Sequence, residues 1–211
     1  SFLQLFSVAA QDTNPNGLFF KPDGTKMYVL GIAGLSVNEY DLSTAWEIST
    51  ASFLQLFSVA AQETNPQDVF FKPDGTKMYV IGATGDDVNE YDLSTAWDVS
   101  TAGSSASTQL TYESFGIAFS LDGTKLYAIT TGKTIYEYPL STAFDITTFG
   151  TSTSNVASGV AQTVTGFSGG STTGSLYVVT SSDEKITAFT FPSALSLGTG
   201  SFASTDVGKT I

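Results

Sequence analysis

The side chains best suited to chemistry form a series of acidic and amide residues that recurs just before an apolar segment. Carboxylate and amide oxygens can hold cations, and amides also hydrogen-bond small polar ligands. If the apolar segments are the innermost strands of a radial fold, these side chains converge at the mouth of its axial channel. The alternative is a set of solvated loop residues with Asn-Pro turns. The series comprises Asp12, Asn14, Asn16, Glu63, Asn65, Gln67, Asp68 and Glu113.

A second acidic pair, Asp86 and Asp87, follows Gly85 in a loop. Paired carboxylates offer oxygen ligands to Ca2+, which needs about six to eight of them. The matching residues of the preceding repeat, Leu35 and Ser36, supply at most one ligand, which favours solvated charge. We expect no catalytic residue, no metal-binding residue and no cofactor, and Ca2+ is the one alternative left open.

A sequence repeat positions these residues. Residues 17–42 return almost unchanged as residues 68–93, and eroded copies follow. A period of about 50 residues indicates an array or a propeller. The most durable part reads FKPDGTKMYV at residues 20–29 and again at 71–80, FSLDGTKLYA at 119–128 and GSLYV at 174–178.

Each repeat contains four short segments rich in β-branched and aromatic residues, which predicts four strands. In the first repeat they are residues 2–8, 18–20, 26–31 and 37–42. The Asp-Gly pair between the second and third segments favours a tight turn with positive φ at Gly24, Gly75 and Gly123, and the aspartates cap their own turns. The first strand of the fourth repeat is expected near residues 163–168.

Four antiparallel strands that cannot bury both sheet faces alone are typical of a propeller blade. We therefore predict an all-β fold, a single β-propeller domain over residues 1–211, with the outer strand of each blade supplied by the start of the next repeat. A closed four-bladed ring and a section of a larger ring or assembly both stay open. The predicted repeats span about residues 1–51, 52–102, 103–149 and 150–200, followed by a terminal strand within 201–211.

The ten-residue cores resemble the F-S-P-D-G-x-x-L-Y-V motif of YVTN-type and related PD40 propeller repeats. This resemblance covers about ten residues per repeat, so it implies the fold and carries no activity. The longer YDLSTAW segment, residues 40–46, also resembles repeats of virion and surface proteins of marine phages and bacteria. The fourth repeat departs from the motif because it lacks the Pro-Asp pair.

Composition narrows the possible functions. The 20 acidic residues outnumber the 8 basic ones, giving a net charge of -12, which argues against nucleic-acid partners. Every basic residue is Lys, and the chain has no Arg, His or Cys. It therefore lacks bidentate phosphate clamps, imidazole bases, thiolates and the usual zinc ligands. No apolar stretch is long enough to span a bilayer. A surface rich in Ser, Thr, Asn and Gln favours an extracellular, cell-surface or virion location.

Differences between the first two repeats concentrate on one predicted face. Gly17 is replaced by Asp68 in the loop that enters the first strand, and residues 32–36 differ from 83–87 in the loop joining the second and third strands. Binding residues often lie on loops held by a rigid scaffold, although unrestrained loops also drift. We expect this face to bind a protein or glycan. Trp46 and Trp97, on the opposite face, are expected to be blade-packing residues and not exposed platforms for sugars.

We therefore predict a non-catalytic binding or structural propeller. The alternative is a metal-dependent hydrolase of the sugar-lactonase kind, with metal and carboxylates at the channel mouth. The opening segment, residues 2–8, adds one outer strand more than a four-bladed ring needs. We expect it to complete the fourth blade as a clasp, with residues 201–211 packing peripherally, or to pair with a neighbouring molecule and support self-assembly.

Overall fold

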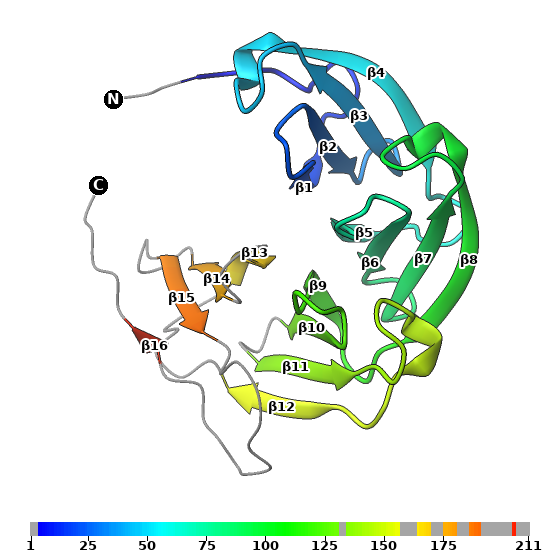
Figure 1. Cartoon of the computed structure of the whole chain (residues 1–211), viewed down its shortest axis with the longest axis vertical. Coiled ribbons are helices and arrows are strands. Elements are labelled where there is room, and N and C mark those ends of the chain that lie inside the picture. Colours follow the sequence, from blue (N-terminus) through cyan, green and yellow to red (C-terminus); the bar gives the residue numbers. More distant parts are fainter. Residues whose placement is uncertain are drawn as a thin grey trace. The chain divides into compact units, whose positions relative to one another are not determined.

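The computed structural model describes residues 4–130, 134–156, 164–169, 175–180, 186–190 and 204–205, and in these residues β-strands are joined by turns and three short 3-10 helices (Figure 1). No helix in this part of the chain is long and apolar enough to cross a membrane. The chain divides into two compact units, Ser1–Glu113 and Ser114–Ile211.

The first unit consists of two four-stranded antiparallel sheets, which we call blade 1 and blade 2. In each sheet the strands follow one another in chain order. Blade 1 contains β1 (Pro15–Phe20), β2 (Lys26–Gly31), β3 (Ser36–Leu42) and β4 (Ala51–Ser58). Blade 2 contains β5 (Pro66–Phe71), β6 (Lys77–Gly82), β7 (Asp87–Leu93) and β8 (Ala102–Gln109).

The second unit contains two further sheets of the same kind, blade 3 and blade 4. The four blades confirm the predicted all-β propeller fold, and the strand expected near residues 163–168 is β13. Blade 3 contains β9 (Ser114–Phe119), β10 (Lys125–Thr130), β11 (Thr134–Pro139) and β12 (Thr153–Val156). Blade 4 contains β13 (Val164–Gly169), β14 (Ser175–Thr180), β15 (Ile186–Thr190) and β16 (Ser204–Thr205).

The outer strand of each of the first two blades comes from the repeat that follows. β4 carries the sequence that opens the second repeat and pairs with β3 from Ser36↔Ser58 to Leu42↔Ala51. β8 pairs with β7 in the same way. The predicted exchange of outer strands between repeats is therefore confirmed in blades 1 and 2.

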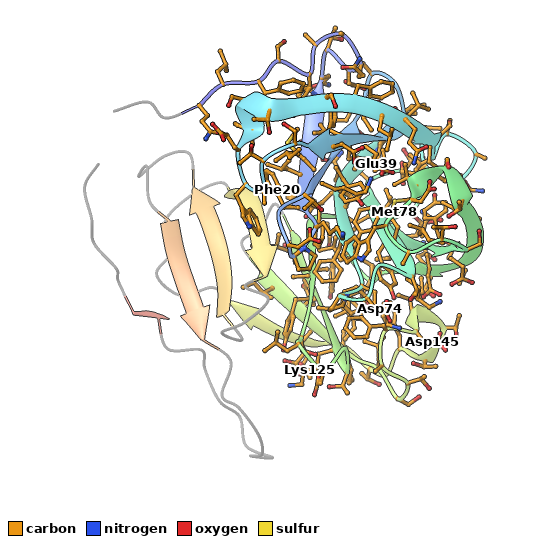
Figure 2. All side chains as sticks on the ribbon, turned by 45° about the horizontal axis from the view of Figure 1, so that its top comes forward. Phe20, Glu39, Asp74, Met78, Lys125 and Asp145 are labelled. Carbon is orange, nitrogen blue, oxygen red and sulfur yellow. The ribbon has the colours of Figure 1, made fainter. Side chains whose placement is uncertain are left out.

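The Asp-Gly turns follow from local chemistry. In blade 1 the carboxylate of Asp23 accepts hydrogen bonds from the backbone N–H of Thr25 at 3.0 Å and from its hydroxyl at 2.7 Å. The hydrogen bond from Lys21, followed by those from Thr25, lowers the pKa of Asp23 to about 2. Asp74, labelled in Figure 2, caps its turn in the same way. Asp122 does so in blade 3. The predicted positive φ is present at Gly24, Gly75 and Gly123.

A large aromatic side chain covers each turn glycine. The N–H of Trp97 donates to the carbonyl oxygen of Gly75 at 3.0 Å, and Trp97 itself has φ of 66°. A Cβ added to Gly75 would lie 2.3 Å from Nε1 of Trp97. Glycine is thus required at this position both by the left-handed backbone and by the indole ring above it.

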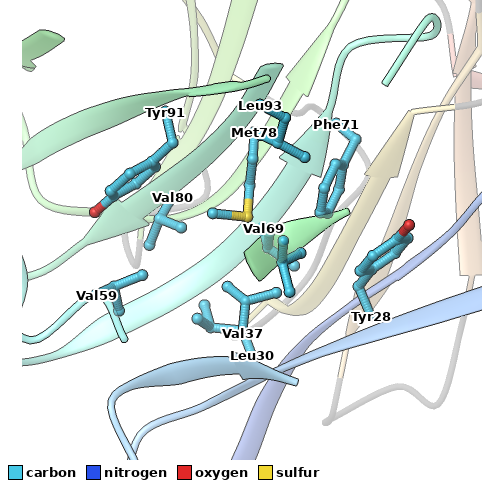
Figure 3. Packing of buried hydrophobic residues seen from close by; sticks show 11 residues of the cluster. Tyr28, Leu30, Val37, Val59, Val69, Phe71, Met78, Val80, Tyr91 and Leu93 are labelled. Atoms are coloured by element: carbon cyan, nitrogen blue, oxygen red, sulfur yellow. The ribbon is translucent and has the colours of Figure 1, made fainter. Parts of the chain in front are cut away.

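Blades 1 and 2 share one apolar core (Figure 3). Tyr28 of blade 1 lies 4.2 Å from Phe71 of blade 2 between ring centroids, and its hydroxyl donates to the carbonyl oxygen of Trp97 at 2.8 Å. Trp97 therefore packs between blades, as predicted. Trp46 does not, because 58% of it is exposed. The buried members of the core are Tyr28, Leu30, Val37, Val59, Val69, Phe71, Met78, Val80, Tyr91, Leu93 and Val99.

A buried carboxylate also joins the two blades. Glu39, on β3, is fully buried (Figure 2) and accepts from Nζ of Lys26 at 2.5 Å in its own blade. Its second oxygen accepts from Nε2 of Gln55 at 2.9 Å and from the N–H of Val99 at 3.0 Å. Val99 is the first residue of the 3-10 turn η2 (Val99–Thr101). The amide of Gln55 also donates to Asp98 at 2.6 Å. We call Glu39, Gln55 and Val99 the blade clamp.

The expectation for the opening strand is wrong in two respects. Residues 1–3 lie outside the described part of the chain, and Gln4 to Val8 belong to no strand. The outer strand of blade 4 is β16, which pairs with β15 through Ala188↔Thr205 and Phe189↔Ser204. Inside the first unit β3 already pairs with β4, so residues 4–8 find no free strand there. Pairing with a neighbouring molecule stays a prediction.

Replacing Gly75 by alanine tests the turn. The added Cβ meets both a left-handed backbone and the Trp97 ring, so the free energy of unfolding should fall by at least about 1 kcal/mol. Gly103→Ala is the matched control, because its Cβ meets nothing within 4 Å. Chemical denaturation of the two variants measures the difference, and equal stabilities would contradict the turn assignment.

Replacing Glu39 by glutamine tests the clamp. Loss of the buried charge leaves Lys26 and the Val99 N–H poorly paired, so stability should drop by about 3 kcal/mol. Asp41→Asn is the control, since Asp41 binds the same lysine at 2.7 Å but its side chain is 49% exposed. A surface ion pair contributes about 1 kcal/mol or less. Similar losses in both variants, measured by urea unfolding, would refute a special role for Glu39.

Candidate functional site

Two of the predicted site residues are buried inside their blades. Asp12 is 3% exposed, and its carboxylate accepts from the N–H of Asn14 at 2.7 Å and from the N–H of Gly34 at 2.6 Å. Glu63 is fully buried and accepts from the N–H of Asn65 at 2.5 Å. Each carboxylate thus holds together the loops at one end of its blade. Their convergence at a channel mouth stays a prediction.

Glycines in the second strands make room for these carboxylates. A Cβ on Gly31 would lie 1.9 Å from Oδ2 of Asp12, and one on Gly82 would lie 1.7 Å from Oε2 of Glu63. In blade 3 the same strand position is Thr130, which is buried. Glu113, expected to continue the series, is exposed instead. A buried carboxylate at the position of Asp12 or Glu63 therefore requires a glycine at the end of the second strand. The sequence analysis did not predict this pairing.

Blade 2 also contains two buried polar atoms without a hydrogen-bond partner in the described structure, Oε2 of Glu63 and the hydroxyl of Tyr91. Burial, followed by the negative charges of Asp87 and Glu63, raises the pKa of Tyr91. The phenol is therefore neutral in ordinary buffers and available as a donor.

The amide side chains that enter the innermost strands do come together. Nδ2 of Asn16, on β1, donates to Oε1 of Gln67, on β5, at 3.0 Å. Nε2 of Gln67 then donates to Oδ1 of Asn65 at 2.9 Å and to its carbonyl oxygen at 3.2 Å. We call Asn16, Gln67 and Asn65 the amide row. It joins blade 1 to blade 2 at the start of their inner strands.

Two further predicted residues flank the amide row in sequence. Asn14 is exposed, and its carbonyl oxygen accepts from the N–H of Ile32 at 3.0 Å. Asp68 follows Gln67 on β5 and is half-buried, with Oδ1 accepting from the N–H of Val69 at 2.9 Å. The end of blade 2 therefore carries a carboxylate where blade 1 has Gly17.

The second acidic pair is held within blade 2. Asp87 accepts from Nδ2 of Asn89 at 2.9 Å and from the hydroxyl of Ser107 at 3.0 Å, while Asp86 has a left-handed backbone with φ of 53°. None of these bonds reaches the amide row. Among the residues described by the structure, no group of three or more His, Cys, Asp or Glu side chains could hold a metal ion. The expected absence of a metal stays a prediction, with Ca2+ at this loop as its alternative.

The charges of the first unit are segregated along its strands. Its lysines follow the first strand or begin the second, at the end opposite the amide row, and each pairs with a carboxylate. The amide row is therefore followed in sequence by the carboxylate of Asp68, and none of these four lysines lies at its end of the strands. Such a site disfavours anions and suits neutral or cationic polar groups. The four lysines are Lys21, Lys26, Lys72 and Lys77.

Comparisons with known proteins add the fold but no family. No family model and no curated protein matches the chain. Among solved structures, a "putative 6-phosphogluconolactonase" of Bacteroides fragilis is 16% identical with a TM-score of 0.59, covering 91% of this chain and 53% of its own. A second structure of the same description, from Bacteroides uniformis, is 17% identical with a TM-score of 0.56. The match covers 91% of this chain and 53% of the Bacteroides uniformis chain. Hydrazine synthase of Kuenenia stuttgartiensis is 18% identical with a TM-score of 0.55. The match covers 90% of this chain and 48% of the hydrazine synthase chain.

These neighbours correct one expectation. The prediction that the chain is not an enzyme is wrong as an exclusion, because its fold is one that lactonase-like proteins use. The missing His, Cys and Arg remove particular reagents and do not remove catalysis as a class. The resemblance to YVTN-type and PD40 repeats stays a prediction. The comparisons establish the β-propeller fold of this chain, over about half the length of each neighbour.

Proposed function

We propose that the chain binds a neutral, sugar-like ligand at the amide row. The observation that carries this proposal is the hydrogen-bonded series Asn16, Gln67 and Asn65, which spans the inner strands of two blades. An amide group offers a donor and an acceptor side by side, and this pattern complements neighbouring hydroxyl groups. The hydrogen bonds within the row fix the orientation of each amide before a ligand arrives, which lowers the ordering cost of binding.

The charge distribution narrows the ligand class. Asp68 follows Gln67 directly in sequence, and the four lysines of the first unit lie at the other end of the strands. The charge nearest to the row in sequence is therefore negative, which disfavours a phosphorylated sugar. Neutral sugars on a glycan, or a neutral sugar lactone, fit this environment better. A glycan partner also agrees with the extracellular or particle-associated location expected from composition.

A paired substitution tests ligand binding. The double variant Asn16→Ala and Gln67→Ala should weaken binding of a neutral sugar by about tenfold or more, since each lost hydrogen bond is worth about 1 kcal/mol. The control is Ser43→Ala, at the opposite end of blade 1, which should bind as the unchanged protein does. Calorimetry with hits from a glycan array gives the dissociation constants. Equal affinities in the double variant and the control would refute the site.

A second candidate function is hydrolysis of a neutral sugar lactone at the same place, and the likeness to the two Bacteroides proteins supports it. In this reaction water adds to the lactone carbonyl carbon and the ring C–O ester bond breaks. The carboxylate of Asp68 takes the proton from the attacking water and returns it to the released hydroxyl oxygen. The amides of the row orient the sugar hydroxyls during the reaction.

Lactone hydrolysis is measured above the spontaneous rate, with a neutral aldonolactone and its phosphorylated form compared. The neutral lactone should react faster. Asp68→Asn should lower the enzymatic rate by about a hundredfold or more, the usual contribution of a general base. Asp86→Asn is the control, because that carboxylate lies outside the row. No rate above background, or a preference for the phosphorylated lactone, would refute this candidate without affecting the binding proposal.

A further inference from the structure

Within the first unit, one face of blade 1 lacks the neighbour that the same face of blade 2 possesses. Leu18 is 56% exposed, whereas Val69 at the same repeat position is 2% exposed. Trp46 is 58% exposed, whereas Trp97 is largely covered. Since the two repeats are almost identical in sequence, the difference arises from packing. We call the surface formed by Leu18, Trp46 and the adjoining turn the open face.

Blade 2 shows which contacts such a face makes. Trp97 stacks on Phe19 of blade 1 with ring centroids 6.3 Å apart, and its carbonyl oxygen accepts the hydroxyl of Tyr28 at 2.8 Å. Trp97 also contacts Phe71 of its own blade at 5.7 Å, and Trp46 makes the matching contact with Phe20 at 5.7 Å. The indole and carbonyl of Trp46 are therefore placed to receive an aromatic side chain and a tyrosine hydroxyl.

The open face also has the 3-10 turn that the blade clamp uses in blade 2, but not the glutamate that binds it. In blade 2 the N–H of Val99 is bound by Glu39 and the N-cap Asp98 is bound by Gln55. In blade 1 the equivalent 3-10 turn is η1 (Ile48–Thr50), whose N-cap Glu47 makes no side-chain capping bond. Within the described residues no carboxylate accepts from the N–H of Ile48. The turn is built like η2 but lacks the glutamate that η2 receives.

The segment that precedes β1 repeats the sequence of an outer strand. Gln4, Phe6 and Val8 repeat Gln55, Phe57 and Val59. Phe6 contacts the edge of Tyr40 at 5.5 Å, just as Phe57 contacts Tyr91 at 5.3 Å. Oε1 of Gln4 accepts from the N–H of Ser49 in η1 at 3.4 Å. Residues 4–8 thus pack on blade 1 as an outer strand packs on blade 2, without the sheet to which an outer strand belongs.

The sequence of the repeats identifies the sheet that fits. Three blades carry a Lys–Glu ion pair between their second and third strands, namely Lys26–Glu39, Lys77–Glu90 and Lys125–Glu137. At these positions the fourth repeat has Ser175 and Ala188. The fourth repeat therefore carries no glutamate at the position that Glu39 occupies in the first repeat. A matching partner must carry the Tyr28, Lys26 and Glu39 equivalents together.

We propose that the open face of blade 1 binds a further blade of the blade 1 type, whose third strand pairs with residues 4–8 and whose glutamate binds the N–H of Ile48. The proposal excludes the fourth blade of a second copy as the occupant, because that blade lacks the lysine and the glutamate. The site would use a β-strand addition at residues 4–8 together with the clamp contacts, so main-chain bonding and the buried glutamate act together.

In the experiment an additional copy of residues 1–51 is fused ahead of Ser1, and the fluorescence of Trp46 is measured. Trp46 is made the only tryptophan of the fused protein. Trp97 and the tryptophan of the added copy are replaced by phenylalanine, a residue that blade 3 already uses at this place as Phe144 over Gly123. The unfused chain with Trp97→Phe gives the exposed reference. The unfused chain with Trp46→Phe, which retains Trp97, gives the covered reference. Acrylamide quenching and emission wavelength are measured for each protein.

In the fused protein, quenching of Trp46 should fall from the exposed reference to the covered one, with emission moving to shorter wavelength. A fused control with Lys26→Ser and Glu39→Ala in the added copy, the residues of the fourth repeat, should leave Trp46 exposed. A folded fusion with Trp46 still exposed overturns the proposal, and so does equal protection by the control copy. Light scattering on the unfused chain supplies a third arm. Self-association that protects Trp46 would make a second copy the occupant and also overturn the proposal.

Discussion

The buried carboxylate of Glu39 is the interaction on which the first unit depends. It neutralises Lys26 within blade 1, orders Gln55 on the outer strand and binds the N–H of Val99 in blade 2. A buried charge is costly unless it is paired and fully hydrogen-bonded, so the three partners must be present together. This requirement fixes the register between β3, β4 and the following 3-10 turn. The apolar core around Tyr28 and Phe71 then packs in one arrangement.

The sequence revealed the local features of this fold because their causes lie within a few residues. Asp23 and Gly24 specify a turn by themselves, and the alternation around Met27 specifies a strand. The clamp could not be read in this way, because Glu39 and Val99 are far apart in sequence and a glutamate on a strand is usually exposed. The exposure of Trp46 was also missed, since it depends on which neighbour is present and not on the residue.

The candidate site was predicted in part. Convergence of Asn16, Asn65 and Gln67 followed from their place at the start of inner strands, which is a property of the topology. Asp12 and Glu63 occupy similar sequence positions but turn inward, because Gly31 and Gly82 leave a space that only a neighbouring side chain can fill. The absence of a side chain at one position thus decides the direction of another. A pattern based on polar residues alone does not contain that information.

The transfer of outer strands between repeats has a consequence for how the molecule unfolds. β4 belongs to the second repeat in sequence and to blade 1 in space, so melting the second repeat removes the edge of the sheet before it. Neighbouring repeats are then coupled through a shared sheet as well as through a packed face. This coupling increases the free energy of the interface between repeats relative to the intrinsic stability of each repeat. Partly melted forms with one intact blade are correspondingly rare. The first unit behaves as one cooperative element, and a local weakness in either blade is felt by both.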